Sequence, residues 1–210
     1  LTGPAVDRSA RESKDLRDYL HQDTELLAEY WDSYGLVTLH RQRNGILTMK
    51  VNGKADASTG PTDRANMLFV GDLALLHHPK PKRALCIGLG GGLTLAAMAK
   101  HPVERLDCVE LSPAVVRGAG HFKEAIGGVL DDKRVNLIVG DGRNAILFGR
   151  EPYDVIVSQP SNLWVSGMAN LFTRDFFDES ARRLAPGGIF CQWVHPYYLS
   201  PGNPRGVFRY

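Results

Sequence analysis

The chain has 210 residues, of which 43% are hydrophobic and 23% charged, and its formal net charge is +2. These values are ordinary for a globular protein with one good-sized domain. Because the basic residues are spread along the chain, we expect no nucleic-acid surface and no direct membrane contact. No apolar run approaches the ~20 residues of a membrane span. The first residue is Leu1, so we expect a processed product or a piece of a longer protein.

The three cysteines, Cys86, Cys108 and Cys191, all lie inside apolar runs, and no C-x-x-C spacing occurs. This pattern argues against a zinc site and against a disulfide framework. It favours reduced, buried thiols, and therefore a cytoplasmic location. No spacing of histidines indicates a metal site either.

The N-terminal part divides into a polar stretch and a β-rich stretch. Residues 1–25 are charged, and we expect a frayed segment or a short helix. Residues 34–41 and 46–51 alternate and are rich in β-formers, with Asn44-Gly45 between them as a hairpin turn. Residues 1–60 are therefore predicted to form a polar segment plus a small β-hairpin unit.

From residue 61 onward the pattern alternates between strand and helix. Apolar strands are predicted at 83–88, 106–110, 134–140, 154–158 and 189–194. Helices are predicted at 67–77, 93–100, 113–122 and 172–184, with a short one from about residue 143. Repeated β-α units with apolar strands predict a doubly wound, mainly parallel α/β sheet in a domain spanning residues 61–210.

A glycine-rich turn lies between the first of these strands and the helix after it, with Gly88, Gly90 and Gly92 in a G-x-G-x-G spacing. Such a turn lets a ligand approach the backbone at a helix N-terminus. The spacing differs from the G-x-G-x-x-G of dinucleotide sites, which favours a nucleoside-sulfonium ligand over NAD. The alternative is a tight turn with a structural role only.

Acidic residues end the next two strands. Glu110 is placed to accept hydrogen bonds from ribose hydroxyls, or it is a solvated residue at a strand end. Asp141, followed by Gly142, could accept from an adenine amino group, and it could equally cap the helix that follows. After the fourth strand the chain carries Gln159, where many enzymes place an acid or a base. Glutamine can orient an amine, but it has no useful basicity.

The order of these motifs resembles the S-adenosylmethionine-dependent transferase superfamily. More specifically, the segments AspGlyArgAsn, SerGlnProSerAsn and LeuAlaProGlyGly resemble the spermidine synthase-like family, in particular a bacterial branch with members fused to a transporter. The resemblance implies decarboxylated S-adenosylmethionine or S-adenosylmethionine as co-substrate, a small amine as acceptor, a homodimer and no metal. It implies donor-binding roles for Gly88, Leu89, Gly90, Gly92, Glu110, Asp141 and Gly142.

The sequence departs from the family pattern at the positions that hold the amine groups. Gly91 replaces an aspartate of the glycine turn, Asp56 replaces a glutamine, and Asn66 replaces a tyrosine. Gln159 and Asn162 replace an aspartate pair, and we expect them to orient the acceptor at the catalytic position. Losing these charges argues against an ordinary putrescine substrate.

Three functions remain open at this point. The first is an aminopropyltransferase-like enzyme with an atypical acceptor pocket. The second is a methyltransferase that uses intact S-adenosylmethionine, because no aspartate at Gly91 would repel the donor's carboxylate. The third is a non-catalytic nucleoside-binding domain.

Overall fold

The computed structural model describes residues 24–160 and 168–194. Within them the chain forms two sheets, an antiparallel one with the strand order β1-β2-β3-β4 and a parallel one with the order β7-β6-β5-β8-β9. The predicted doubly wound α/β fold with a small N-terminal β unit is therefore confirmed.

The N-terminal sheet is larger than the predicted hairpin. It contains β1 (Thr24–Asp32), β2 (Gly35–Gln42), β3 (Leu47–Val51) and β4 (Lys54–Ser58). The β2–β3 turn at Asn44-Gly45 is where the sequence places it, and Gly45 has a φ of 83°. The helix or frayed end expected up to residue 25 is wrong at its last residues, because β1 begins at Thr24 and pairs with β2 along its length.

The strands and helices of the parallel domain follow one another along the chain as predicted. Its strands are β5 (Arg83–Ile87), β6 (Arg105–Glu110), β7 (Val135–Val139), β8 (Tyr153–Ser158) and β9 (Leu184–Gln192). Its helices are α2 (Pro61–His77), α3 (Leu93–Ala99), α4 (Pro113–Ala119), α5 (Gly142–Phe148) and α6 (Arg174–Arg183), with short 3-10 turns at Gly120–Phe122, Val129–Asp131 and Met168–Phe172.

Two element starts differ from the prediction by five residues or more. The helix expected from residue 67 begins six residues earlier, because Pro61 is compatible with the first helical turn. The strand expected from residue 189 begins at Leu184, directly after α6. Tyr153 pairs with Leu184 and Val155 with Ile189, so the Pro-Gly-Gly segment forms an irregularity within β9 instead of a separate loop.

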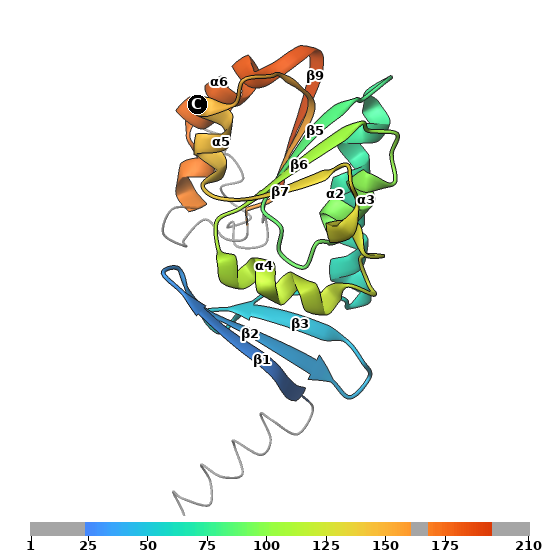
Figure 1. The fold of residues 1–210 in the computed structure, drawn as a ribbon, viewed down its shortest axis with the longest axis vertical. Helices are drawn as coiled ribbons and strands as arrows, with labels where there is room; N and C mark the ends of the chain where they lie inside the picture. Colours follow the sequence, from blue (N-terminus) through green and yellow to red (C-terminus); the bar gives the residue numbers. More distant parts are fainter. Residues whose placement is uncertain (1–23, 161–167, 195–210) are drawn as a thin grey trace, which may run out of the picture.

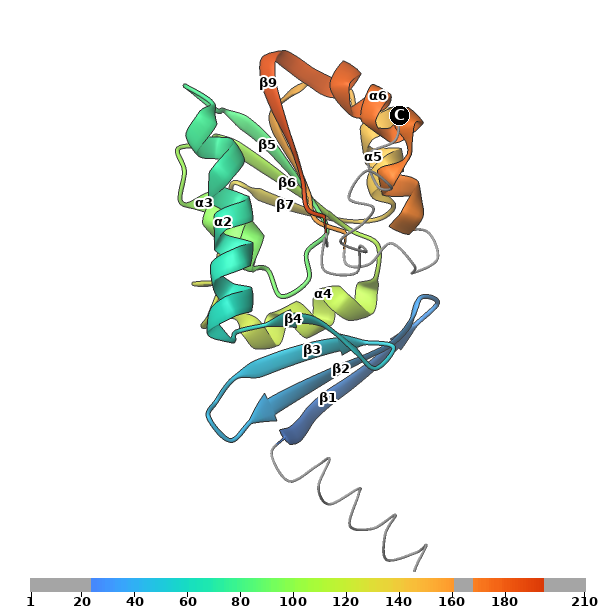
Figure 2. The same cartoon turned by 180° about the vertical axis from the view of Figure 1, so that it is seen from behind.

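Helices cover both faces of the parallel sheet, as Figure 1 and the reverse view in Figure 2 show. One face packs against α2 and α3, and its core includes Cys86, Cys108 and Val157. The other face packs against α5 and α6 through residues such as Ile156 and Phe176. Cys86 and Cys108 are buried and Cys191 is half-buried, and all three are free thiols.

The N-terminal sheet packs against α4, on the side of the parallel sheet where the strands end (Figures 1 and 2). Asp32, at the end of β1, makes one of the polar connections between the two. Its Oδ2 accepts a hydrogen bond from Ser112 Oγ at 2.5 Å and from the backbone N–H of Ala114 at 3.0 Å, at the start of α4. Burial acts to raise the pKa of Asp32, but these hydrogen bonds outweigh it and the pKa is lowered.

In the described ranges no helix combines the length and the apolar character needed to cross a membrane.

Candidate functional site

A cavity of about 950 Å³ opens at the carboxyl ends of the parallel strands, beneath the N-terminal sheet. In an open α/β sheet this edge is where ligands bind. Most of the described residues that the sequence suggests for the site line the cavity, namely Gly88, Leu89, Gly90, Glu110, Asp141, Gly142 and Gln159, and Gly92 directly precedes the adjoining helix. Asn162 lies outside the described residues.

The glycine turn after β5 is a close approach of backbones at this edge. Gly88 has a φ of 92°, and a Cβ at this position would lie 2.6 Å from the carbonyl oxygen of Gln159. Any larger residue would therefore push the end of β5 away from β8. The turn continues to Gly92, which adopts a left-handed conformation and precedes α3. The turn thus has a structural function, and it also exposes backbone to the cavity.

Glu110 is buried, with 7% of its surface exposed. Its Oε2 accepts the backbone N–H of Leu89 at 2.8 Å, and its Oε1 accepts the backbone N–H of Ser112 at 2.9 Å. Burial raises the pKa of Glu110 above its usual value, the two backbone donors lower it, and the charge of Asp56 raises it again. The solvated alternative is therefore wrong, and Glu110 holds the glycine turn against the strand end.

Asp141 caps α5. Its Oδ1 accepts the backbone N–H of Arg143 at 2.7 Å and that of Asn144 at 3.4 Å. Asp141 also lines the cavity, so the capping role and a contact with a ligand are compatible. Gly142 packs tightly, because a Cβ there would lie 2.4 Å from Cγ2 of Ile87. The small residue therefore brings the start of α5 close to β5.

Gln159 follows β8 at the opposite end of the cavity from Asp141. Its side-chain amide contacts the Sδ of Met67, on α2, as a donor. Its Oε1 is buried and has no hydrogen-bond partner among the described residues. A buried carbonyl oxygen without a partner costs free energy, which a ligand N–H can recover. Gln159 thus carries an unpartnered, buried acceptor on a residue that lines the cavity.

Three further residues line the cavity: Met67, to which the sequence alone assigns no role, Trp193, which the sequence suggests as either a pocket wall or a core aromatic, and Asp56, which departs from the family pattern. Met67 and Trp193 line it beside Gln159, and Asn66, the neighbour of Met67, is exposed. Asp56 lies on β4, and its Oδ2 would be 4.0 Å from a Cβ on Gly90. The helical spacing around Met67 predicts a buried face, but it does not tell which buried residue meets a strand end.

The position of Gly91 limits what a side chain could do there. A Cβ on Gly91 would lie 3.1 Å from the ring of Phe122 and 3.2 Å from Cβ of Ala57. A side chain at position 91 would therefore press against Phe122 and against Ala57 on β4. With glycine at this position, the turn carries no carboxylate of its own. Asp56 nevertheless brings a negative charge to the same turn from β4.

A doubly wound sheet with a glycine turn and an acid at the next strand end is the arrangement typical of nucleotide-binding α/β folds. The family model for the spermine/spermidine synthase domain matches residues 66–199 of this chain. This match covers more than half of the 210 residues, so the chain belongs to the spermine/spermidine synthase family.

Relatives named for two different activities match the chain at similar identity. Putrescine N-methyltransferase 2 of Nicotiana tabacum is 34% identical over 140 residues, which is 62% of this chain and 39% of the relative. The polyamine aminopropyltransferase of Bacillus mycoides is 34% identical over 142 residues, 67% of this chain and 51% of the relative. The spermidine synthase of Dictyostelium discoideum is 32% identical, covering 64% and 48%. The chain thus spans about half the length of these relatives or less.

Solved structures agree on the fold. A spermidine synthase in complex with the transition-state analogue AdoDATO superimposes with a TM-score of 0.78 at 20% identity, covering 87% of this chain and 61% of that one. The spermidine synthase of Thermotoga maritima gives a TM-score of 0.74 at 21% identity, covering 83% and 59%.

Proposed function

We propose that the chain is the nucleoside-binding part of a transferase that moves a group from a sulfonium nucleoside to a small amine. The donor is decarboxylated S-adenosylmethionine or S-adenosylmethionine. In this proposal Gly88, Leu89, Gly90, Gly92, Glu110, Asp141 and Gly142 bind the donor, and Gln159 with Asn162 orients the acceptor. The names of the curated relatives support the class of reaction.

One observation carries the proposal: Glu110 is buried under the cavity with backbone N–H donors as its hydrogen-bond partners. The described residues place no cation against it to neutralise it. Each carboxylate oxygen can accept more than one hydrogen bond. A pair of ribose hydroxyls above the glycine turn would fill the remaining capacity, and the cavity is large enough for a nucleoside.

At the acceptor end of the cavity, the amine would be recognised by uncharged side chains. Gln159 can accept an N–H of an amine through Oε1, while Met67 and Trp193 provide apolar walls. The reaction is a direct displacement at the carbon attached to the donor sulfur. Positioning of the two reactants supplies much of the rate in such a step.

Aminopropyl transfer is the first candidate reaction, and methyl transfer is the second. The observation that favours methyl transfer is Gly91, because the glycine turn itself carries no acid that would repel the carboxylate of intact S-adenosylmethionine. Asp56, which lies beside the turn, instead favours aminopropyl transfer, because its charge would repel that carboxylate. A homodimer stays a prediction, which light scattering would test.

Titration calorimetry tests the proposal with three ligands: S-adenosylmethionine, decarboxylated S-adenosylmethionine and methylthioadenosine, each with and without putrescine. Preference for the decarboxylated donor, enhanced by putrescine, would support aminopropyl transfer. Preference for intact S-adenosylmethionine without a putrescine effect would support methyl transfer. Binding with no turnover on any amine would leave a nucleoside-binding domain, and absence of nucleoside binding would contradict the proposal.

A further inference from the structure

The proposed reaction needs a proton acceptor, and Gln159 cannot supply one. An amine is protonated at neutral pH and must lose a proton before its nitrogen can attack. An amide oxygen orients such a group without taking its proton. The described residues of the cavity include a small set of ionisable side chains, namely Tyr34, Lys54, Asp56, Glu110 and Asp141.

Two of the three carboxylates in this set have structural roles. Glu110 uses both oxygens to hold the backbone of Leu89 and Ser112. Asp141 caps α5 and lies after β7, which is separated from β8 by β6 and β5 in the strand order. A base at either position would be displaced from the acceptor end of the cavity by at least one strand.

Asp56 approaches from the other side of the cavity, on β4. Its Oδ2 would lie 4.0 Å from a Cβ on Gly90, so the carboxylate borders the glycine turn. That turn follows β5, which pairs with β8 on one side and with β6 on the other. Asp56 therefore borders the cavity beside the turn of β5, the strand that lies between β8, which leads to Gln159, and β6, which ends at Glu110. The charge of Asp56 also raises the pKa of Glu110, as expected for two carboxylates on the same cavity.

We infer that Asp56 is the catalytic base of the proposed transfer, across the cavity from Gln159. This inference rests on the proposed function. The Asp56 carboxylate takes one proton from the ammonium group of the acceptor, while Gln159 Oε1 accepts a second N–H and fixes its direction. The nitrogen lone pair then forms a bond to the donor carbon, and the electrons of the C–S bond pass to sulfur. The products are a secondary ammonium and a neutral thioether nucleoside.

Paired variants test the inference by separating binding from turnover. Asp56→Asn keeps the size of the side chain and removes its basicity. The matched control is Asp63→Asn, which changes an exposed aspartate in the first turn of α2. The double variant Asp56→Asn with Gln159→Asp returns a carboxylate to the opposite wall. Thermal unfolding establishes that each variant is folded, and Asp56→Ser is a second neutral variant.

We expect Asp56→Asn to lower kcat about 10²–10⁴-fold, the usual contribution of general acid–base catalysis. The affinity for methylthioadenosine should change by less than about threefold, because a group that acts in the transition state leaves ground-state binding in place. The acidic limb of the pH profile of kcat/KM should move toward the pKa of the free acceptor amine, and the double variant should recover at least about tenfold of the lost rate. The Asp63→Asn control should match the wild type.

Three results would overturn the inference. The first is turnover of Asp56→Asn within about threefold of the wild type, since a base cannot be removed at so small a cost. The second is a loss of nucleoside affinity as large as the loss of turnover, which would make Asp56 a donor anchor. The third is an unchanged acidic limb of the pH profile. Failure of the wild type to bind a nucleoside, or to transfer to any amine, would instead contradict the proposed function and remove the inference with it.

Discussion

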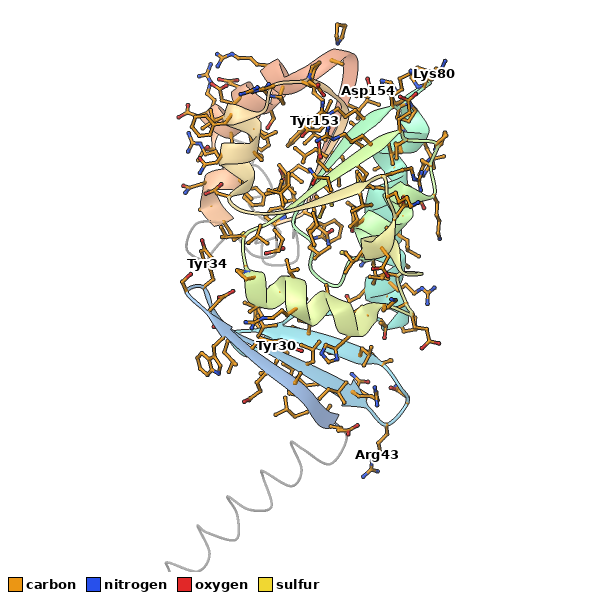
Figure 3. All side chains as sticks on the ribbon, in the orientation of Figure 1. Tyr30, Tyr34, Arg43, Lys80, Tyr153 and Asp154 are labelled. Carbon is orange, nitrogen blue, oxygen red and sulfur yellow. The ribbon has the colours of Figure 1, made fainter. Side chains whose placement is uncertain are left out.

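Asp107 and Glu110 lie on the same strand, β6, and both are buried, yet their surroundings are opposite. Asp107 accepts hydrogen bonds from four side chains, two of them cationic: Arg83, Arg105, Asn136 and Tyr153. Glu110 accepts hydrogen bonds from backbone N–H groups. Figure 3 shows Tyr153, a partner of Asp107, at the end of the sheet far from the N-terminal sheet, whereas Tyr34 lies at the β1–β2 turn.

The pKa values follow this difference. Burial acts to raise the pKa of Asp107, but hydrogen bonds from Asn136, Tyr153 and Arg105 outweigh it, so the pKa is lowered. For Glu110 burial prevails and the pKa is raised. A buried carboxylate with its own cations stabilises the fold, and one without them is a candidate for a ligand site. Four measurements can break or sharpen this contrast.

The largest effect is expected from Asp107→Ala. It leaves Arg83, which is 18% exposed, without its buried partner. Removing one member of a buried ion pair costs about 3–5 kcal/mol, and we expect a loss of this size in the free energy of unfolding. Urea unfolding would measure it. The control Asp178→Ala removes a surface carboxylate on α6 and should cost less than about 1 kcal/mol. Equal losses for both variants would contradict the structural role of Asp107.

Glu110→Gln should act mainly on binding. The amide keeps one oxygen acceptor and loses the other, which costs about 1.5–3 kcal/mol for a charged hydrogen bond. We therefore expect the affinity for methylthioadenosine to fall about 10- to 100-fold, measured by calorimetry. Asp107→Asn is the matched control, because it changes an acid on the same strand away from the cavity. If Glu110→Gln binds as the wild type does, Glu110 does not contact the ligand.

A smaller effect is expected from Asn136→Ala. This variant removes a neutral donor that lies 2.8 Å from Asp107 Oδ1 and leaves both arginines in place. We expect the free energy of unfolding to fall by about 0.5–1.5 kcal/mol, as for an ordinary hydrogen bond. A loss as large as that of Asp107→Ala would show that the neutral donors, and not the cations, hold the carboxylate.

The smallest effects should appear in the pH dependence of stability, with opposite signs for the two acids. The lowered pKa of Asp107 contributes stability above its usual value of 3.8, and this stability is lost as the pH falls through the folded-state pKa. The raised pKa of Glu110 contributes in the other direction: stability is gained as the pH falls through the folded-state pKa toward the usual value of 4.5. Unfolding curves of the wild type and Glu110→Gln, recorded from pH 7 to pH 4.5, should therefore move apart in favour of the wild type. Parallel curves would show that Glu110 has an ordinary pKa.

The position of Glu110 in this contrast was accessible from sequence, because strand ends can be predicted from apolar runs. β6 is placed within one residue of its predicted start, and Glu110 is correctly put at its carboxyl end. The glycine turn, Asp141 and Gln159 are placed at the same edge for the same reason. Local sequence patterns therefore predicted which residues lie along one edge of the sheet.

The residues from distant parts of the chain that contact these strand ends could not be predicted. β1 carries charged residues on a half-exposed strand, and its partners on α4 are about 80 residues away in sequence. Asp56 was noted as a departure from the family pattern, but its position beside Gly90 depends on how β4 passes over the turn. Three of the four partners of Asp107 likewise come from other strands: Arg83 from β5, Asn136 from β7 and Tyr153 from β8. Contacts of this range have no local signal.

The hydrogen bonds of Asp32 limit how this protein can be truncated or its N-terminal sheet exchanged. Asp32 holds Ser112, whose backbone N–H is bound to Glu110, which in turn holds Leu89. The boundary near residue 60, which we propose on sequence grounds, therefore divides the chain but does not divide the site. A chimera that takes its N-terminal sheet from another relative would need an acceptor at position 32 to match Ser112. Without it, Ser112, next to the proposed donor site, would lose its hydrogen bond to the N-terminal sheet.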